Sequence, residues 1–127
     1  MKQIRVVVAA TKGFGNYKIL SEKLNGYLDQ MSPVYRKNVE FVTGSEGMVR
    51  ELVEQYTLDN GHQFRAYEAY WDKDGDQAGY FRNNAMLLHA SKGIGVLFIF
   101  WDGKSISVKN LVELAQHHGV EVKVVKY

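Results

Sequence analysis

The stretch Ile4-Arg5-Val6-Val7-Val8-Ala9 decides the fold of this chain. It is a β-branched run of the kind found in strands that are buried on both faces of a sheet. Gly95-Val96-Leu97-Phe98-Ile99-Phe100 is a second such run, and it is the clearest strand in the sequence. Both runs indicate strands of an α/β protein.

Amphipathic segments alternate with strands along the rest of the chain. Asn16 is placed to cap a helix whose apolar residues recur at helical spacing up to Met31, and Ser32-Pro33 is expected to end that helix. Further helices are predicted after Gly47, from Arg82 and after Ser105, and further strands at residues 39–42, 64–67 and 120–125. This alternation predicts a single Rossmann-like α/β domain with a mostly parallel five-stranded sheet, strand order 3-2-1-4-5 and helices on both faces.

The composition fits one domain spanning residues 1–127. An apolar fraction of 46% is ordinary for a folded chain. There is no cysteine, so disulfides and thiolate metal sites are excluded and a reducing compartment is expected. The N-terminus lacks the pattern of a signal peptide, and no segment approaches the roughly 20 apolar residues of a membrane span. We therefore expect a cytoplasmic protein with no membrane partner.

Charge and metal-ligand spacing argue against two further classes of function. The net charge of +2 is too weak to indicate a nucleic-acid partner. The aspartates Asp72, Asp74 and Asp76 suggest calcium, but Asn83 stands where an EF-hand loop requires glutamate. The four histidines are predicted at or near helix ends, as helix C-terminal or surface groups, with no spacing for zinc. We expect no metal and no cofactor other than a nucleotide-type ligand.

In a sheet of this topology, ligands bind in the crevice outside the carboxyl ends of the strands. Loops at residues 11–16 and 101–105 are expected to form its floor, and loops at residues 43–47 and 71–82 its side. The candidate ligand-binding residues are Thr11, Lys12, Gly44, Ser45, Glu46, Gly47, Trp71, Arg82, Asn83, Trp101, Asp102, Gly103 and Ser105.

Several of these residues have two interpretations. Lys12 either pairs with a phosphate or is a solvated lysine. The loop at residues 44–47 either approaches a ligand closely or is a plain turn into a helix, and Glu46 either complements the helix N-terminus or binds ribose hydroxyls.

Arg82 and Asn83, at the expected start of the third long helix, also leave two interpretations open. Arg82 either makes a bidentate contact with a phosphate or forms a structural ion pair that holds Asp72, Asp74 or Asp76 of the preceding loop. Asn83 suits a base edge, a ribose or a neighbouring loop. Trp71 and Trp101 either stack on a base or pack at the ends of the third and fourth strands.

The polar segment contains the pattern Trp71-Asp72-x-x-Gly75-x-x-Ala78-Gly79-x-x-Arg82-Asn83-x-x-Met86. This pattern resembles the signature of small SLOG-superfamily proteins, the branch related to YspA and YpsA. The order of elements is similar over nearly the whole chain, and the other loops match by position. The resemblance implies a Rossmann-like domain whose relatives bind nucleotides, ADP-ribose derivatives or nucleic acid. It also implies a homodimer or higher homo-oligomer, since SLOG domains often pair.

The chain departs from the SLOG pattern in two loops. The second loop usually reads Gly-Gly-Ala-Arg-Gly-x-Asp, and here Glu46 stands at the arginine. The last loop usually carries Gly-Thr after its serine, and here it reads Ser107-Val108. The Pro-Gly-Gly-x-Gly-Thr-x-x-Glu motif of related phosphoribohydrolases is absent. The resemblance therefore supports a pocket better than it supports a reaction.

Three functions are compatible with these observations. The first is binding of a nucleotide or a nucleotide-derived signal, ADP-ribose or cyclic ADP-ribose-like, by a sensor or sequestering protein. The second is a hydrolase that cleaves an N-glycosidic or phosphate bond, with Glu46 or Asp102 as acid or base. The third is a nucleic-acid processing module. The sequence favours binding without catalysis, because the phosphoribohydrolase motif is missing and a carboxylate at a helix N-terminus tends to a lowered pKa.

Overall fold

The computed structural model describes residues 2–127 and is built around one parallel β-sheet. Its strands are β1 (Ile4–Ala10), β2 (Val39–Gly44), β3 (Gln63–Tyr67), β4 (Ile94–Trp101) and β5 (Glu121–Lys126). They lie in the order β3-β2-β1-β4-β5, and each neighbouring pair is parallel. The predicted fold class, strand number and strand order are confirmed.

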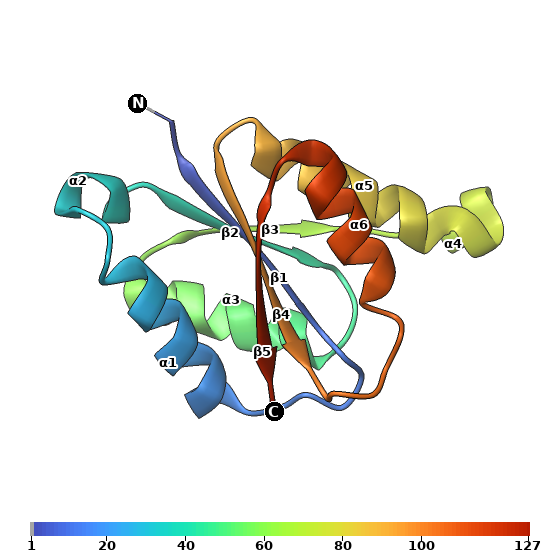
Figure 1. Ribbon diagram of the computed structural model, residues 1–127, viewed down its shortest axis with the longest axis horizontal. Helices are drawn as coiled ribbons and strands as arrows, with labels where there is room; N and C mark the ends of the chain where they lie inside the picture. The colour runs from blue at the N-terminus through green and yellow to red at the C-terminus, as the bar shows by residue number, and fades with distance from the viewer. Residues whose placement is uncertain (1) are drawn as a thin grey trace.

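Helices cover both faces of the sheet. They are α1 (Tyr17–Leu28), α2 (Pro33–Arg36), α3 (Met48–Asn60), α4 (Trp71–Asp74), a 3₁₀ turn (Gly75–Gln77), α5 (Ala78–Ser91) and α6 (Lys109–His118). Figure 1 shows α1 and α3 on one face and α5 and α6 on the other. Within residues 2–127, no helix is long and apolar enough to cross a membrane.

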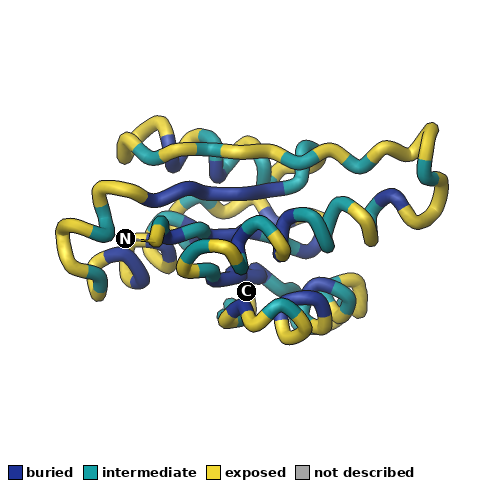
Figure 2. The backbone as a smooth tube through the Cα atoms, turned by 90° about the horizontal axis from the view of Figure 1, so that it is seen from above, coloured by how far each residue is buried: buried dark blue, intermediate teal, exposed yellow. Residues whose placement is uncertain are grey.

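The central strand β1 is buried on both faces, as its sequence predicts. Val6 and Val8 belong to the apolar cluster that includes Leu24 of α1. Val7 points the other way and belongs to the cluster that includes Leu87 of α5. This alternation follows from the two-residue period of a strand. Figure 2 shows the buried stretches along the inner strands and exposed residues on the outer sides of the helices.

The first helix begins where the sequence predicts but ends before its predicted end. The side chain of Asn16 accepts a hydrogen bond from the backbone N–H of Ile19 at 3.0 Å, which confirms the predicted cap. However, α1 ends at Leu28, so Met31 lies beyond it. Pro33 does not merely end that helix: it starts the short helix α2, because proline has no N–H to lose at a first helical position.

The segment before α5 corrects the sequence prediction most clearly. Residues 71–77 are helical, and α5 begins at Ala78, so Arg82 and Asn83 lie inside the helix and do not open it. Asp72 and Asp74 favour α4 because acidic groups complement a helix N-terminus. Trp71 therefore starts α4 and does not end the third strand, whereas Trp101 does end β4.

The start of α6 also differs from the prediction. This helix begins at Lys109, after the predicted position at Ser105 to Ser107. Asp102 holds the preceding loop in a turn, because its carboxylate accepts hydrogen bonds from the backbone N–H groups of Lys104 and Ser105, each at 2.8 Å.

A buried carboxylate that the sequence analysis did not single out lies on β2. Glu40 is 6% exposed and hydrogen-bonds with His89, in the last turn of α5, and with Arg65 of β3. His89 is thus at a helix C-terminal end, which is one of the two expected positions, and its side chain is 18% exposed. Burial raises the pKa of the Glu40 carboxyl, yet the hydrogen bonds from His89 and Arg65 outweigh burial and hold that pKa below its ordinary value.

The lowered pKa of Glu40 makes the folded state sensitive to acid. A carboxyl whose pKa is lowered by folding contributes stability above its ordinary pKa of 4.5, and this contribution is lost as pH falls through the folded value. Glu40→Gln should lower the free energy of unfolding at pH 7 by about 1–3 kcal/mol. It should also flatten the loss of stability between pH 5 and pH 3, measured by urea unfolding at each pH.

Glu113→Gln is the matched control, because Glu113 is exposed on α6. It should leave both quantities nearly unchanged. A Glu40→Gln protein that loses stability in acid as steeply as the wild type would contradict the role assigned to this carboxylate.

Candidate functional site

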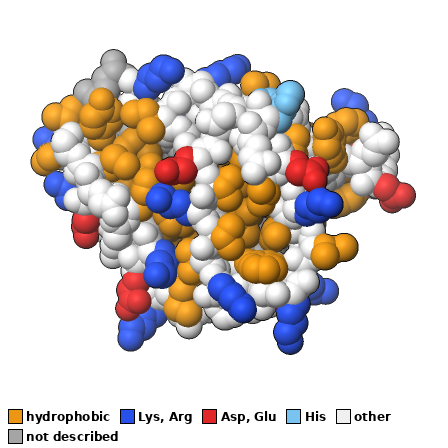
Figure 3. Space-filling view, viewed as in Figure 1, with side chains coloured by type: hydrophobic (Ala, Val, Ile, Leu, Met, Phe, Trp, Pro, Cys, Tyr) orange, Lys and Arg blue, Asp and Glu red, His pale blue; other side chains and the backbone are white. Residues whose placement is uncertain are grey.

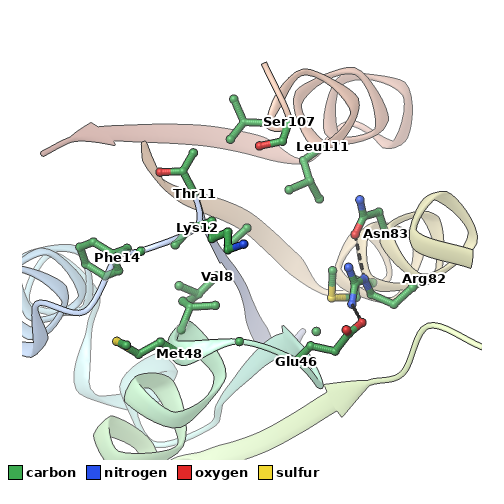
Figure 4. Close-up of a pocket in the computed structure, with 18 of the residues that line it drawn as sticks. Val8, Thr11, Lys12, Phe14, Glu46, Met48, Arg82, Asn83, Ser107 and Leu111 are labelled. Carbon is green, nitrogen blue, oxygen red and sulfur yellow. Dashed lines mark hydrogen bonds and ion pairs between the residues drawn. The ribbon is translucent and has the colours of Figure 1, made fainter. Parts of the chain in front are cut away.

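A cavity of about 620 Å³ opens at the carboxyl ends of β1 and β2, at the position that the topology predicts. Its walls come from the β1–α1 loop, the start of α3, the second turn of α5 and the segment leading into α6. Figure 4 shows these elements facing one another across the cavity. The predicted site residues that line it are Thr11, Lys12, Gly44, Glu46, Gly47, Trp71, Arg82 and Asn83.

The other predicted residues, Ser45, Trp101, Asp102, Gly103 and Ser105, do not line this cavity. The loop after β4 is closed on itself: the Trp101 indole N–H donates to the Ser105 carbonyl at 2.8 Å, and the Ser105 hydroxyl donates to Asp102 at 2.7 Å. Hydrogen bonds from Ser105 and Lys104 hold the pKa of Asp102 below its ordinary value. The backbone N–H of Ser45 donates a hydrogen bond to the carbonyl oxygen of Tyr67.

Thr11 lines the cavity, but its side chain is engaged in hydrogen bonds that hold the structure together. Its hydroxyl accepts from the backbone N–H of Asp102 at 3.0 Å and lies 2.7 Å from the hydroxyl of Tyr127. The residue is 2% exposed. The hydroxyl therefore ties the loop after β4 and the residue that follows β5 to the cavity floor.

Arg82 and Glu46 belong to a network that crosses the cavity wall from α5 to the loop after β2. The Arg82 Nε donates to Asn83 Oδ1 at 2.9 Å, and its Nη1 lies 3.9 Å from Glu46 Oε1. The Trp71 indole N–H donates to the same Glu46 oxygen at 3.1 Å. The Asn83 amide donates to Asn110 of α6 at 3.1 Å. Figure 4 shows Arg82 between Asn83 and Glu46.

This network overturns one predicted role of Arg82. The residue does not clamp Asp72, Asp74 or Asp76; its acidic partner is Glu46. A Cβ atom on Gly44 would lie 2.5 Å from Arg82 Nη1, so the guanidinium rests on the backbone of Gly44. Gly44 therefore admits the Arg82 side chain, whereas the sequence left open whether this loop approaches a ligand or is a plain turn. Burial lowers the pKa of Arg82, and Glu46 opposes that effect.

Lys12, on another wall of the cavity, is a cation that remains open to a ligand. It is exposed, and none of the ion pairs found within residues 2–127 includes it. Figure 4 shows its side chain extending from the β1–α1 loop into the cavity. The N-terminus of α3 also lines the cavity, and its cap residue Gly47 offers no side-chain hydrogen bond. Free helix N–H groups and an ammonium both favour an anion.

Apolar side chains form the remaining wall, and the sequence analysis did not assign them to the site. They include Val8, Phe14, Met48, Met86, Val108 and Leu111. Phe14 stacks on Phe100 of β4 with ring centroids 4.7 Å apart, so it is also a core residue. Met48 covers Gly15, where a Cβ atom would lie 2.5 Å from the methionine sulfur. Apolar patterning signals burial but does not say which buried residues border a cavity.

Ser107 also lines the cavity; the sequence places a ligand over a helix N-terminus at Ser105 to Ser107, but Ser107 is not among the thirteen candidate residues. The signal that would have placed it is the turn held by Asp102, which delays the start of α6. No group of three or more histidine, cysteine, aspartate or glutamate side chains within the described part of the chain could hold a metal ion.

A second cavity of about 540 Å³ lies between the end of β3 and α5. Tyr67, Tyr70 and Phe81 line it, together with Asp74. Arg82 lines both cavities and so stands in the wall that they share.

Comparisons with known proteins do not place the chain in a family. No family model matches it, and neither a curated protein nor a solved structure matches it. The function must therefore be argued from the site.

The contacts of Arg82 predict that its removal destabilises the fold. Arg82→Ala should lower the free energy of unfolding by about 1–3 kcal/mol, because Glu46 and Asn83 lose a charged partner. Arg36→Ala is the control, since the Arg36–Asp29 pair is 4.0 Å long and well exposed, and it should cost less than about 1 kcal/mol. Denaturant unfolding measures both. An Arg82→Ala protein as stable as the wild type would show that Arg82 is not a brace.

Proposed function

We propose that the protein binds a nucleotide or a nucleotide-derived small molecule, such as ADP-ribose or a cyclic ADP-ribose-like signal, in the cavity beside β1. The observation that carries this proposal is the combination of Lys12, which no ion pair found within residues 2–127 includes, with an extensive apolar wall in a space of about 620 Å³. Cavities of roughly 300–1,000 Å³ with a few polar groups suit small molecules. The ammonium of Lys12 suits a phosphate, and the apolar wall suits a base.

The SLOG-like signature gives independent support to the same place. Of its residues, Trp71, Arg82, Asn83 and Met86 all line the cavity. In this proposal Arg82 and Asn83 shape the pocket through their own hydrogen bonds, and Lys12 meets the ligand.

A sensor or sequestering role fits the site better than catalysis. Glu46 is the one carboxylate among the described residues that line the cavity, and one of its oxygens is already held by Trp71 and Arg82. That oxygen is therefore already occupied by contacts within the protein. Asp102, the other candidate acid or base, lies outside the lining. A hydrolase would have to rely on Glu46, and a nucleic-acid module would lack a strongly basic surface.

Self-association is a further part of the proposal. Large apolar side chains are exposed on α4, on α5 and just before α4, among them Tyr70, Trp71, Tyr80, Phe81 and Leu88. Figure 3 shows hydrophobic side chains near the centre of one face and around α4. Exposed apolar groups of this kind are typical of interaction surfaces.

Sedimentation velocity at micromolar concentration should show a dimer or a larger species. A monomer throughout would contradict the proposed self-association.

Lys12→Ala should weaken binding of ADP-ribose or AMP by about 10- to 100-fold, because a charge-assisted hydrogen bond to phosphate is lost. Isothermal titration calorimetry measures the loss, and thermal unfolding should show an unchanged fold. Lys18→Ala is the control, since Lys18 is exposed on α1 away from the cavity. If the wild-type protein binds none of the nucleotides and ADP-ribose derivatives offered at millimolar concentration, the proposal fails.

A further inference from the structure

Glu46 makes one part of the cavity acidic, whereas Lys12 makes another part basic. Its Oε1 accepts from the Trp71 indole at 3.1 Å and faces Arg82 Nη1 at 3.9 Å. No hydrogen bond found within residues 2–127 uses its Oε2, and 56% of the side chain is exposed. One carboxylate oxygen is therefore held in place while the other is free to accept hydrogen bonds in the cavity.

The neighbouring polar side chains in the acidic part of the cavity are partly engaged by other residues. The Asn83 carbonyl oxygen accepts from Arg82, and the Asn83 amide donates to Asn110. Glu46 compensates the positive charge of Arg82, and the Nε of Arg82 already donates to Asn83. Glu46 Oε2 is thus an acceptor in this part that no hydrogen bond found within residues 2–127 uses, and it can accept hydrogen bonds from a ligand.

The free positive charge lies elsewhere, on Lys12 of the β1–α1 loop. An anionic group placed beside Lys12 gains from its charge, whereas an anionic group placed beside Glu46 meets a carboxylate. A ligand that carries both a phosphate and hydroxyls is therefore oriented, with its phosphate toward Lys12 and its hydroxyls toward Glu46. Figure 4 shows the two side chains on different walls of the cavity.

We infer that Glu46 is a specificity-determining residue that accepts hydrogen bonds from an unsubstituted pair of ribose hydroxyls and rejects ligands with a phosphate on that pair. An acidic side chain shortly after the second strand can bind a ribose diol in this way in a doubly wound sheet. A 2′-phosphate needs an uncompensated cation there, and the nearby Arg82 is paired with Glu46. This inference rests on the proposed function, since it assigns a ligand class to the same cavity.

Two probe pairs test the inference, each differing by a single 2′-phosphate: AMP with adenosine 2′,5′-bisphosphate, and ADP-ribose with its 2′-phosphate. The wild-type protein should bind the unsubstituted member at least about tenfold more tightly, because like charges in contact are strongly unfavourable. Glu46→Gln keeps the size of the side chain and removes its charge, so the preference should fall to about threefold or less. Calorimetry of each pair gives the ratio directly.

Glu22→Gln removes an exposed charge from α1 and should leave the ratio as in the wild type. Equal affinity for the two members of each pair that binds would overturn the inference and leave the proposed function standing. An unchanged preference in Glu46→Gln would also overturn it, because the discrimination would come from another group. If no probe of either pair binds, the proposed function fails and the inference with it.

Discussion

Burial of β1 between two helical layers is the constraint on which the rest of the structure depends. Val6 and Val8 pack toward α1 and α3, and Val7 packs toward α5 and α6. A strand in this position has parallel neighbours on both sides, here β2 and β4. The chain leaves β1 and β4 in different directions, so a space opens at this edge of the sheet, and the cavity occupies it at the carboxyl ends of β1 and β2. The cavity is thus a consequence of the strand order, before any side chain is considered.

The polar wall of the cavity is organised by Arg82. Its guanidinium spans from α5 to the loop after β2, rests on Gly44 and lies close to Glu46. Because Trp71 holds the same carboxylate, α4 is joined to this wall as well. Most of the conspicuous polar residues therefore hold one another. Among the described residues, the groups left for a ligand include the Lys12 ammonium, one oxygen of Glu46 and the Ser107 hydroxyl.

The sequence predicts the parts of this protein that depend on local pattern. Val6 to Val8 and the run in β4 indicate buried strands, and parallel topology then brings Lys12, Glu46 and Arg82 to one edge. Pairing between distant segments has no such local signature, so the contact of Arg82 with Glu46 was missed, as was the burial of Glu40. The loop after β4 was misjudged for a related reason, because Asp102 suits a turn as well as a ligand.

Arg82 lines two cavities at once, the one beside β1 and the one between β3 and α5. A molecule in the second cavity that drew the guanidinium away from Glu46 would change the charge that a ligand meets in the first. Thermodynamic linkage makes such an effect reciprocal, so each occupant would alter the affinity of the other by the same factor. A single side chain in a shared wall is thus sufficient to couple two sites without any movement of the sheet.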